Sequence, residues 1–309
     1  MGIRVLNLIG DQAEAAARAA VPGAEILSYP ATEVPDDLRA EAMFTTWTPA
    51  PIHERLDEIG VRWMHIPGTG VDNWPRELLA ARTVTCARGI SAVPIAEYVL
   101  AAMLAFEKDI PRIFLEEVPE HWNFAQLGEL AGKTVGIIGL GGIGEAVASR
   151  ALAFDCRVRA LRRRPQQGAP AGVELATDLA DLLATADHLV IAAPSTSVTR
   201  HLLDEAAFAL VKPGVHIVNI ARGTLVDQDA LRRALDDERV AMATLDTVTP
   251  EPLPAGHWLF EHPRVRVTAH ISWSSPHAWG RIMASFADNL ARYVAGEPLV
   301  GVVDPDEGY

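Results

Sequence analysis

Residues 133–144 combine a short buried-strand pattern with a glycine-rich turn and the opening turn of a helix. Within this segment Gly139, Gly141 and Gly144 follow the G-x-G-x-x-G pattern, in the strand–turn–helix context that the pattern requires,. Gly139 permits a tight turn, Gly141 lets a pyrophosphate reach the backbone, and Gly144 lets the helix pack close to the strand. The motif therefore predicts a dinucleotide bound at a helix N-terminus. The alternative is a plain strand–turn–helix with three incidental glycines.

Strand and helix patterns alternate on both sides of this motif, which predicts parallel sheets with helices on their faces,. One series fills the first ninety-odd residues, and a second series begins at Thr134. We expect an α/β protein with two Rossmann-like domains and a cleft between them. A doubly wound, parallel-sheet nucleotide domain of residues 99–276 is inserted in a smaller, flavodoxin-like substrate domain of residues 1–98 and 277–309.

The segment between the two series, residues 91–106, is apolar nearly all round, with Ser91 as its expected N-cap. A helix of this composition must be covered on several sides. We expect it to bridge the domains and to lie in the subunit interface of a homodimer. The alternative is a helix inside the core of a monomer.

Composition excludes several classes of partner. The 309 residues carry a net charge of −13, which argues against a nucleic-acid backbone as the main partner,. Only two cysteines occur, Cys86 and Cys156, so we predict no disulfide framework and no metal site, and we expect a reducing cytoplasm,. The first residues resemble a β-strand rather than a signal peptide, and no apolar run is long enough to cross a membrane,.

The strand after the glycine helix, residues 157–161, ends in Arg162, Arg163 and Arg164. In NAD-binding proteins a carboxylate about 20 residues beyond the glycines holds the adenosine ribose. No acid stands here, and guanidinium groups suit the 2′-phosphate of NADP,. We therefore expect NADP, with NAD as the alternative, although a solvated run of charges on a loop would also explain the arginines.

Four chemically active residues follow predicted strands of the second series: Arg222, Asp246, Glu251 and His270. Ligands of open parallel sheets gather just outside the carboxyl ends of the strands, so we expect these side chains to be neighbours. Each residue alone also has a structural explanation, such as a surface ion pair, a turn residue or a buried histidine. Their joint occurrence at strand ends favours a catalytic site.

Further motifs occur in a fixed order along most of the chain. They are Gly70–Asn73, Ala96–Glu97, Leu130–Gly141, Pro213–Gly214, Asn219–Gly223, Leu225–Asp227, Leu245–Asp246, Pro250–Pro252 and Ala269–His270. With these motifs the chain resembles the D-isomer-specific 2-hydroxyacid dehydrogenase family, and within it the glyoxylate/hydroxypyruvate reductases. The family often has proline before the catalytic histidine, where this chain has Ala269.

The resemblance implies a role for each of the four residues. Arg222 matches the arginine that binds the carboxylate and keto oxygen of a 2-oxo acid, and His270 matches the proton donor to that oxygen. Glu251 matches the acidic partner of the histidine, and Asp246 matches the residue that holds the nicotinamide end of the cofactor. The chemistry agrees, because hydride transfer to a ketone creates an alkoxide that needs a proton, and histidine titrates near neutral pH.

The resemblance also implies contacts for cofactor and substrate. With the glycine loop and the arginines, the expected cofactor-binding residues are Gly139, Gly141, Gly142, Ile143, Gly144, Arg162, Arg163, Pro194, Thr199, Ile220, Ala221 and Asp246. The backbone of Gly68, Thr69 and Gly70 is expected to meet the substrate carboxylate. Trp47 and Trp273 are candidate walls of the substrate pocket, and packing between the domains is the alternative for Trp273.

We therefore expect a reductase that uses NADPH to convert a small 2-oxo acid, such as glyoxylate or hydroxypyruvate, to a D-2-hydroxy acid. One alternative is a formate- or phosphite-type dehydrogenase on the same scaffold. A second is a regulatory protein that senses a dinucleotide and binds other proteins. The sequence leaves the natural substrate, the pathway, the direction of flux and the size of the oligomer open.

Overall fold

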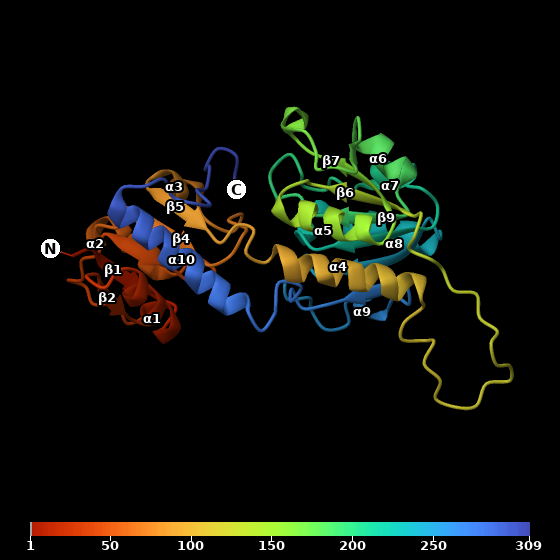
Figure 1. Cartoon of the computed structure of the whole chain (residues 1–309), viewed down its shortest axis with the longest axis horizontal. Helices are drawn as coiled ribbons and strands as arrows, with labels where there is room; N and C mark the ends of the chain where they lie inside the picture. The colour runs from red at the N-terminus through yellow and green to blue at the C-terminus, as the bar shows by residue number, and fades with distance from the viewer. Residues whose placement is uncertain (1) are drawn as a thin grey trace. The chain divides into compact units, whose positions relative to one another are not determined.

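The computed structural model describes residues 2–309, which divide into two compact units. One unit combines the chain up to Ile90 with Ser275–Tyr309, and the other is Ser91–Ser274. The predicted α/β class is confirmed, because each unit is built on a parallel sheet with helices around it (Figure 1). The domain boundary predicted at residues 98/99 would fall inside a helix that belongs wholly to the second unit.

The first unit has a five-stranded sheet in the order β2-β1-β3-β4-β5, with every pair parallel. Its strands are β1 (Arg4–Asn7), β2 (Glu25–Ser28), β3 (Ala42–Phe44), β4 (Trp63–Ile66) and β5 (Thr83–Cys86). Its helices are α1 (Asp11–Ala20), the short 3-10 helix η1 (Pro51–Arg55), α2 (Leu56–Ile59), α3 (Arg76–Ala80) and α10 (Ala278–Ala295). This strand order is that of flavodoxin-like folds.

Alternate residues of these short strands face opposite sides of the sheet. Phe44 and Trp63 lie in a core under α1 and α10, whereas Leu6 and Met64 lie in a second core with η1, α2 and α3. Phe286 of α10 stacks on Phe44, with ring centroids 4.3 Å apart, and also on Trp63. The last helix of the chain therefore completes the core of the first unit.

The second unit has a seven-stranded parallel sheet in the order β12-β11-β10-β9-β6-β7-β8. Its strands are β6 (Thr134–Ile138), β7 (Arg157–Leu161), β8 (Val173–Leu175), β9 (His188–Ile191), β10 (Val215–Asn219), β11 (Val240–Leu245) and β12 (Val265–Val267). Counted from β6, this is the doubly wound order of dinucleotide-binding sheets with one further strand. The strand order reverses between β6 and β9, which is where such sheets bind their ligands.

Helices cover both faces of this second sheet (Figure 1). They are α4 (Ala92–Glu107), α5 (Gly142–Ala153), α6 (Leu179–Thr185), α7 (Glu205–Leu210), α8 (Gln228–Asp236) and α9 (Trp258–Glu261), with short 3-10 turns η2 (Pro165–Gln167) and η3 (Gly223–Leu225). α4 and α5 share one apolar core with the sheet, and α6, α7 and α8 share the other. Both faces are therefore buried, as the apolar strand sequences predict.

Helix α4 is the apolar helix expected from the sequence. Ser91 is its N-cap residue, although the serine side chain makes no capping hydrogen bond. Ile95, Val99 and Met103 are buried in the core shared with α5, while Ala101 on the opposite side is exposed. A place for α4 in a subunit interface stays a prediction.

A long segment without helix or strand follows α4 and precedes β6. Its residues 108–128 form what we call the arm, which runs away from the sheet of the second unit (Figure 1). The arm is closed at its base, because the amide of Gly128 donates to the carbonyl of Glu107 over 2.8 Å and Lys108 Nζ donates to the carbonyl of Gly128 over 2.8 Å. Large apolar side chains of the arm face solvent, among them Trp122, 71% exposed, and Phe124, 85% exposed.

Among residues 2–309, no helix combines the length and the apolar character that crossing a membrane requires. In the same described residues, no group of three or more His, Cys, Asp or Glu side chains has an arrangement that could hold a metal ion. Cys86 and Cys156 are both buried and unpaired.

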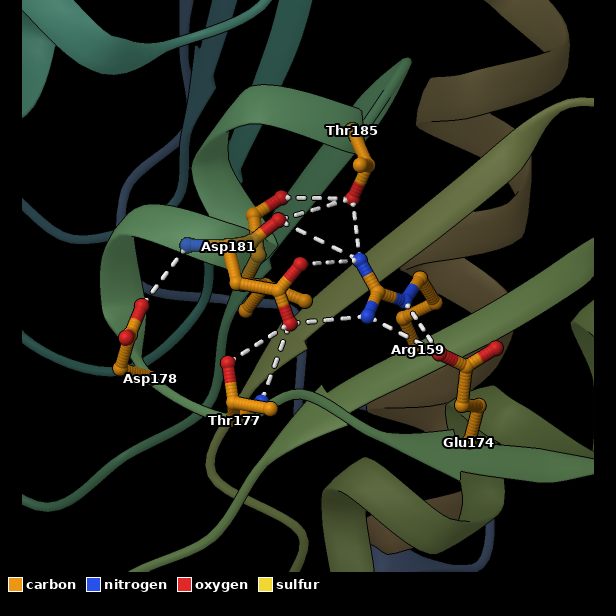
Figure 2. Close-up of polar contacts among 7 residues, drawn as sticks. Arg159, Glu174, Thr177, Asp178, Asp181 and Thr185 are labelled. Atoms are coloured by element: carbon orange, nitrogen blue, oxygen red, sulfur yellow. Dashed lines mark hydrogen bonds and ion pairs between the residues drawn. The ribbon is translucent and has the colours of Figure 1, made fainter.

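An arginine cluster ties the edge strand β8 and helix α6 to β7 (Figure 2). Arg159 donates to both carboxylate oxygens of Asp181, over 3.0 and 2.9 Å, and to Glu174 on β8 over 3.1 Å. Thr177 donates to Asp181 from its amide and its hydroxyl. The hydrogen bonds from Arg159 first, and then those from Thr177, lower the pKa of Asp181 to about 2.

This geometry predicts a pH-dependent loss of stability in Asp181→Asn. A carboxyl whose pKa is depressed in the folded state stabilises the fold above its unfolded pKa of about 3.9, and the contribution disappears as pH falls toward 2,. The variant should therefore unfold at a lower temperature than the wild type at pH 7, and the difference should shrink below pH 4. Thermal unfolding followed by circular dichroism measures both.

Asp178→Asn is the matched control on the same helix. Asp178 is the N-cap of α6 and accepts from the amide of Asp181, a role that asparagine fills equally well,. Equal destabilisation of the two variants at pH 7, or a difference for Asp181→Asn that does not change with pH, would contradict the role given to the Arg159–Asp181 pair.

Candidate active site

The glycine turn lies at the carboxyl end of β6, beside the reversal of strand order. Gly139 has a φ of 99°, and a Cβ there would lie 2.7 Å from the backbone of Ala193. A Cβ at Gly144 would lie 2.2 Å from the carbonyl oxygen of Gly139, so α5 packs this closely only with glycine. A Cβ at Gly141, by contrast, would meet nothing within 4 Å. The glycines thus fix the turn and leave open space at its tip.

This open space lies at the N-terminus of α5, whose first residues are Gly142 and Ile143. The first N–H groups of a helix have no partner within the helix, and the helix dipole adds positive charge there. A backbone cradle without side chains suits a pyrophosphate. The residues present therefore fit a dinucleotide, and Gly141, Gly142 and Ile143 are the ones that would hold its phosphates.

The three arginines follow β7 at the same edge of the sheet. Arg162 is half-buried, and its Nη1 donates to the carbonyl of Gly168 over 2.5 Å, which anchors the loop after η2. Arg163 and Arg164 are exposed. Because β7 neighbours β6, guanidinium groups rather than carboxylates stand where the adenosine ribose of a dinucleotide lies in this fold,.

The loops after β9 and β10 bring the other expected cofactor residues to this edge. Thr199 Oγ1 donates to the carbonyl of Pro194 over 2.7 Å and accepts from the amide of Thr196 over 2.8 Å, so this loop is braced from within. Ile220 and Ala221 directly follow β10 and are buried.

Asn219 and Gly223 position the arginine Arg222. The Asn219 side chain accepts from the amide of Ala221 over 3.1 Å and donates to the carbonyl of Arg222 over 2.9 Å, which shapes the loop after β10. A Cβ at Gly223 would lie 2.0 Å from the backbone of Val248. The loops after β10 and β11 therefore touch backbone to backbone, which brings Arg222 close to the segment that carries Glu251.

Glu251 and His270 form the central pair of the site. His270 Nδ1 and Glu251 Oε2 lie 2.9 Å apart, and Glu251 Oε1 accepts from the amide of Val248 over 3.0 Å. Burial raises the pKa of the Glu251 carboxyl, but the hydrogen bonds from His270 and Val248 and the charges of His270 and Arg222 outweigh it and lower the pKa below its ordinary value. The ionised carboxylate accepts from Nδ1–H, which leaves Nε2 of His270 for a ligand.

Asp246 directly follows β11 and is only 1% exposed. Both oxygens of its carboxylate accept hydrogen bonds. Oδ1 accepts from the hydroxyl of Thr268 over 2.6 Å and from the amide of Ile271 over 2.8 Å. Oδ2 accepts from the amide of Ser272 over 3.0 Å. The carboxylate thus holds the loop on both sides of His270, while a contact with the nicotinamide stays a prediction.

The expected substrate loop lies in the first unit, after β4. The hydroxyl of Thr69 donates to the carbonyl of Ala87 over 3.2 Å, and the amide of Ala87 donates to the carbonyl of Gly68 over 3.0 Å. Gly68 and Gly70 are half-buried. Trp47 lies against this loop, since a Cβ at Gly68 would be 3.5 Å from its ring. The structure therefore brings Trp47 and Gly68–Gly70 together.

The two tryptophans predicted as pocket walls differ in their surroundings. Trp47 is 37% exposed and packs edge to face with Trp279, with ring centroids 5.7 Å apart. Trp273 instead donates from its indole nitrogen to the carbonyl of His270 over 3.0 Å, and its ring packs against the core that α4 and α5 share. The contacts of Trp273 favour a packing role for that side chain. Trp279, which packs against Trp47, is a further aromatic residue beside the expected substrate loop.

Sequence reasoning missed Asn219, Gln228 and Thr268 as supports of the site. Gln228 bridges the loop after β11, donating to the carbonyl of Thr249 over 2.5 Å and accepting from its amide over 3.1 Å. Thr268 joins Asp246 to Tyr98, whose hydroxyl lies 2.8 Å from the threonine oxygen. Short polar side chains at strand ends often bond to the neighbouring backbone, a signal that would have pointed to Asn219.

The chain is similar to several known proteins. Residues 100–272 match the family model described as "D-isomer specific 2-hydroxyacid dehydrogenase, NAD binding domain". The chain is 38% identical over 247 residues to a D-3-phosphoglycerate dehydrogenase of Mycobacterium tuberculosis, an alignment that covers 78% of this chain and 46% of that protein. It is 34% identical over 218 residues to the glyoxylate/hydroxypyruvate reductase A of Serratia proteamaculans, covering 69% of this chain and 68% of that protein.

The chain therefore spans about half the length of the phosphoglycerate dehydrogenases that it matches. Among solved structures, a D-isomer specific 2-hydroxyacid dehydrogenase from Xanthobacter autotrophicus Py2, in complex with NADPH and MES, superposes with a TM-score of 0.85. That comparison covers 100% of this chain and 99% of the other, at 28% identity.

The open space at Gly141 predicts a variant that folds but binds a dinucleotide poorly. An added methyl at Gly141→Ala meets no protein atom within 4 Å, so the variant should fold, with at most a small fall in unfolding temperature because alanine is a poorer N-cap than glycine,. The methyl would occupy the place of the pyrophosphate, and the Kd for NADPH should rise at least about tenfold, as expected when buried phosphate contacts are lost. Fluorescence titration with NADPH measures the change.

Gly280→Ala is the control, because a Cβ at Gly280 on α10 also meets nothing within 4 Å. It should leave the Kd unchanged and should not lower the unfolding temperature, because alanine favours a helix more than glycine does,. NADPH binding of wild-type strength in Gly141→Ala would mean that the turn does not hold the phosphates.

Proposed function

Because the chain belongs to the D-isomer specific 2-hydroxyacid dehydrogenase family, we propose that it reduces a small 2-oxo acid to a D-2-hydroxy acid with NADPH. The observation that supports this most strongly is the His270–Glu251 pair at 2.9 Å, with Arg222 close enough to act on the charge of Glu251. An imidazole, a carboxylate and a guanidinium at one sheet edge are the groups that carbonyl reduction needs.

Each side chain has one task in this proposal. Bound NADPH supplies the hydride that adds to the carbonyl carbon. His270, protonated and held at Nδ1 by Glu251, donates its Nε2 proton to the carbonyl oxygen, which becomes the hydroxyl of the product. Arg222 polarises the carbonyl and pairs with the substrate carboxylate. From the family resemblance, Gly68, Thr69 and Gly70 are proposed to bind the substrate carboxylate through their backbone.

NADP rather than NAD is the proposed cofactor. Arg162, Arg163 and Arg164 follow β7 where a carboxylate would otherwise repel a 2′-phosphate,. The solved relative from Xanthobacter autotrophicus is described with NADPH, which supports the same choice. The family model is named for NAD binding, so NAD stays the alternative.

The proposed substrate has a short or apolar side chain without a phosphate, of the glyoxylate or hydroxypyruvate kind. Trp47 and its neighbour Trp279 stand beside the Gly68–Gly70 loop and offer aromatic surface rather than charge. The reductase of Serratia proteamaculans is named for glyoxylate and hydroxypyruvate, whereas the Mycobacterium tuberculosis relative is named for phosphoglycerate. We favour the unphosphorylated class because aromatic rings give a phosphate no charge-assisted partner.

A regulatory protein that only senses a dinucleotide is the second candidate, and a formate- or phosphite-type dehydrogenase is the third. A regulator would bind NADPH tightly without turnover. The His270–Glu251 pair favours an enzyme, since a binding protein has no need of a proton donor at this position.

Replacing His270 tests the proposed activity. His270→Ala should lower kcat for 2-oxo acid reduction by about 10²- to 10⁴-fold, the usual loss when a general acid is removed, and leave the Kd for NADPH unchanged. NADPH consumption against a panel of 2-oxo acids measures kcat. His121→Ala, an exposed histidine of the arm, is the control. Near-normal turnover in His270→Ala, or no turnover of any 2-oxo acid by the wild type, would contradict the proposal.

Replacing Arg163 tests the proposed cofactor. Arg163→Ser should lower the ratio of kcat/KM for NADPH over NADH by about 10- to 100-fold, mainly through KM for NADPH, because a charge-assisted hydrogen bond to the 2′-phosphate is lost. Arg157→Ser, an exposed arginine at the other end of β7, is the control and should leave the ratio unchanged. A wild-type protein that prefers NADH would overturn the choice of NADP.

A homodimer assembled through the arm is also proposed. The arm exposes several large apolar side chains, among them Trp122 and Phe124, and a cluster of this kind marks an interaction site,. A second copy of the chain would cover it. Phe124→Asp should shift the mass measured by sedimentation from two chains to one. Phe260→Asp, which changes a 60% exposed side chain on α9, is the control. A wild type that sediments as one chain would exclude this dimer.

A further inference from the structure

His270 has an unusual backbone for a residue with a side chain. Its φ is 55°, in the left-handed region that residues other than glycine seldom adopt,. Such a conformation persists only where the surrounding contacts impose it, and it occurs preferentially at functional sites. The contacts that impose it here therefore decide where the imidazole points.

One set of these contacts comes from Asp246. The amide of His270 donates to the backbone carbonyl of Asp246 over 2.9 Å. The next two amides, of Ile271 and Ser272, donate to the Asp246 carboxylate. Three successive N–H groups are thus held, but these bonds leave the carbonyl of His270 itself unfixed.

Trp273 holds that carbonyl. Its indole Nε1–H donates to the His270 oxygen over 3.0 Å. The ring is partly buried against the apolar core that contains Ile220 and Leu140, so the donor sits on a rigid support. The peptide group after His270 is therefore fixed at its oxygen by Trp273 and at its nitrogen by Asp246.

We propose that Trp273 is a positioning residue for His270 through this single hydrogen bond. By fixing the His270 carbonyl it maintains the left-handed backbone, and that backbone keeps Nδ1 at 2.9 Å from Glu251. The imidazole is then oriented before a substrate arrives, as proton transfer requires. This inference rests on the proposed function for the catalytic role of His270, but the positioning itself is a property of the protein without substrate.

The competing role for Trp273 is a wall of the substrate pocket. A wall residue would act through the size and contact of its ring, so its replacement would change KM and the preference among substrate side chains. A positioning residue acts through its N–H, so its replacement would change kcat at nearly constant KM. The two roles therefore predict opposite kinetic results.

Trp273→Phe removes the donor and keeps an aromatic ring. With NADPH and the best 2-oxo acid of the panel, kcat should fall about three- to tenfold, the range expected for one lost hydrogen bond, while both KM values change less than about twofold. Trp258→Phe, another tryptophan of the second unit that lies over Arg232, is the control with unchanged kcat. A raised KM with unchanged kcat, or kinetics equal to those of the wild type, would overturn the proposal.

A second measurement does not depend on turnover. In the proton NMR spectrum, the Nδ1–H of His270 bonded to Glu251 should give a downfield resonance that is absent from His270→Ala. That resonance should weaken or broaden in Trp273→Phe and persist in Trp258→Phe. An unchanged resonance in Trp273→Phe refutes the positioning, whereas a lost resonance in a protein without turnover refutes only the proposed function.

If Trp273→Phe does not fold, the same tests apply to the protein carrying benzothienylalanine at position 273. This analogue keeps the size of the indole and replaces its N–H by sulfur. The expected and the refuting results are those given for phenylalanine.

Discussion

A buried carboxylate at the end of β11 organises the candidate site. Asp246 is 1% exposed, and a charge with so little access to water is tolerated only when its oxygens find donors,. The donors come from Thr268, Ile271 and Ser272, so the chain must wrap around the carboxylate as it leaves β12. The position of His270 follows from this wrapping. The hydrogen bonds that stabilise the buried charge are therefore also the ones that set the geometry of the site.

The parallel sheet supplies the rest of the convergence. β10, β11 and β12 are consecutive strands of the sheet and end at the same edge, so Arg222 and His270, 48 positions apart in the chain, leave that edge with only β11 between their strands,. Glycine at position 223 then lets one loop touch the backbone of the next. Polar groups gather at this edge because the parallel strands all have their carboxyl ends there,. The chemistry of the site is thus a consequence of topology as much as of residue choice.

The sequence predicted what depends on local pattern and missed what depends on tertiary neighbours. The alternation of strands and helices in both units was expected, as was the glycine turn. β2, β5 and β8 have the weakest local signal, because they are short and carry polar residues, as in Thr83–Cys86, and they form strands only by pairing with adjacent strands,. The pairing of Glu251 with His270 was expected from resemblance. The left-handed φ of His270 and the indole bond from Trp273 were not, since no local pattern encodes them.

The first unit is assembled from two ends of the chain, and this sets an order on biosynthesis. Side chains of α10 pack in the core beneath Phe44: Ile282, Met283 and Phe286. Further along the chain, Val302 forms an isolated β-bridge to Thr85 of β5. A nascent chain can therefore complete the contiguous second unit while it is still being translated. Until residue 302 has left the ribosome, α1 alone covers the face of the N-terminal strands that α10 later completes. This delay exposes the strands of the first unit to chaperones and to aggregation during synthesis.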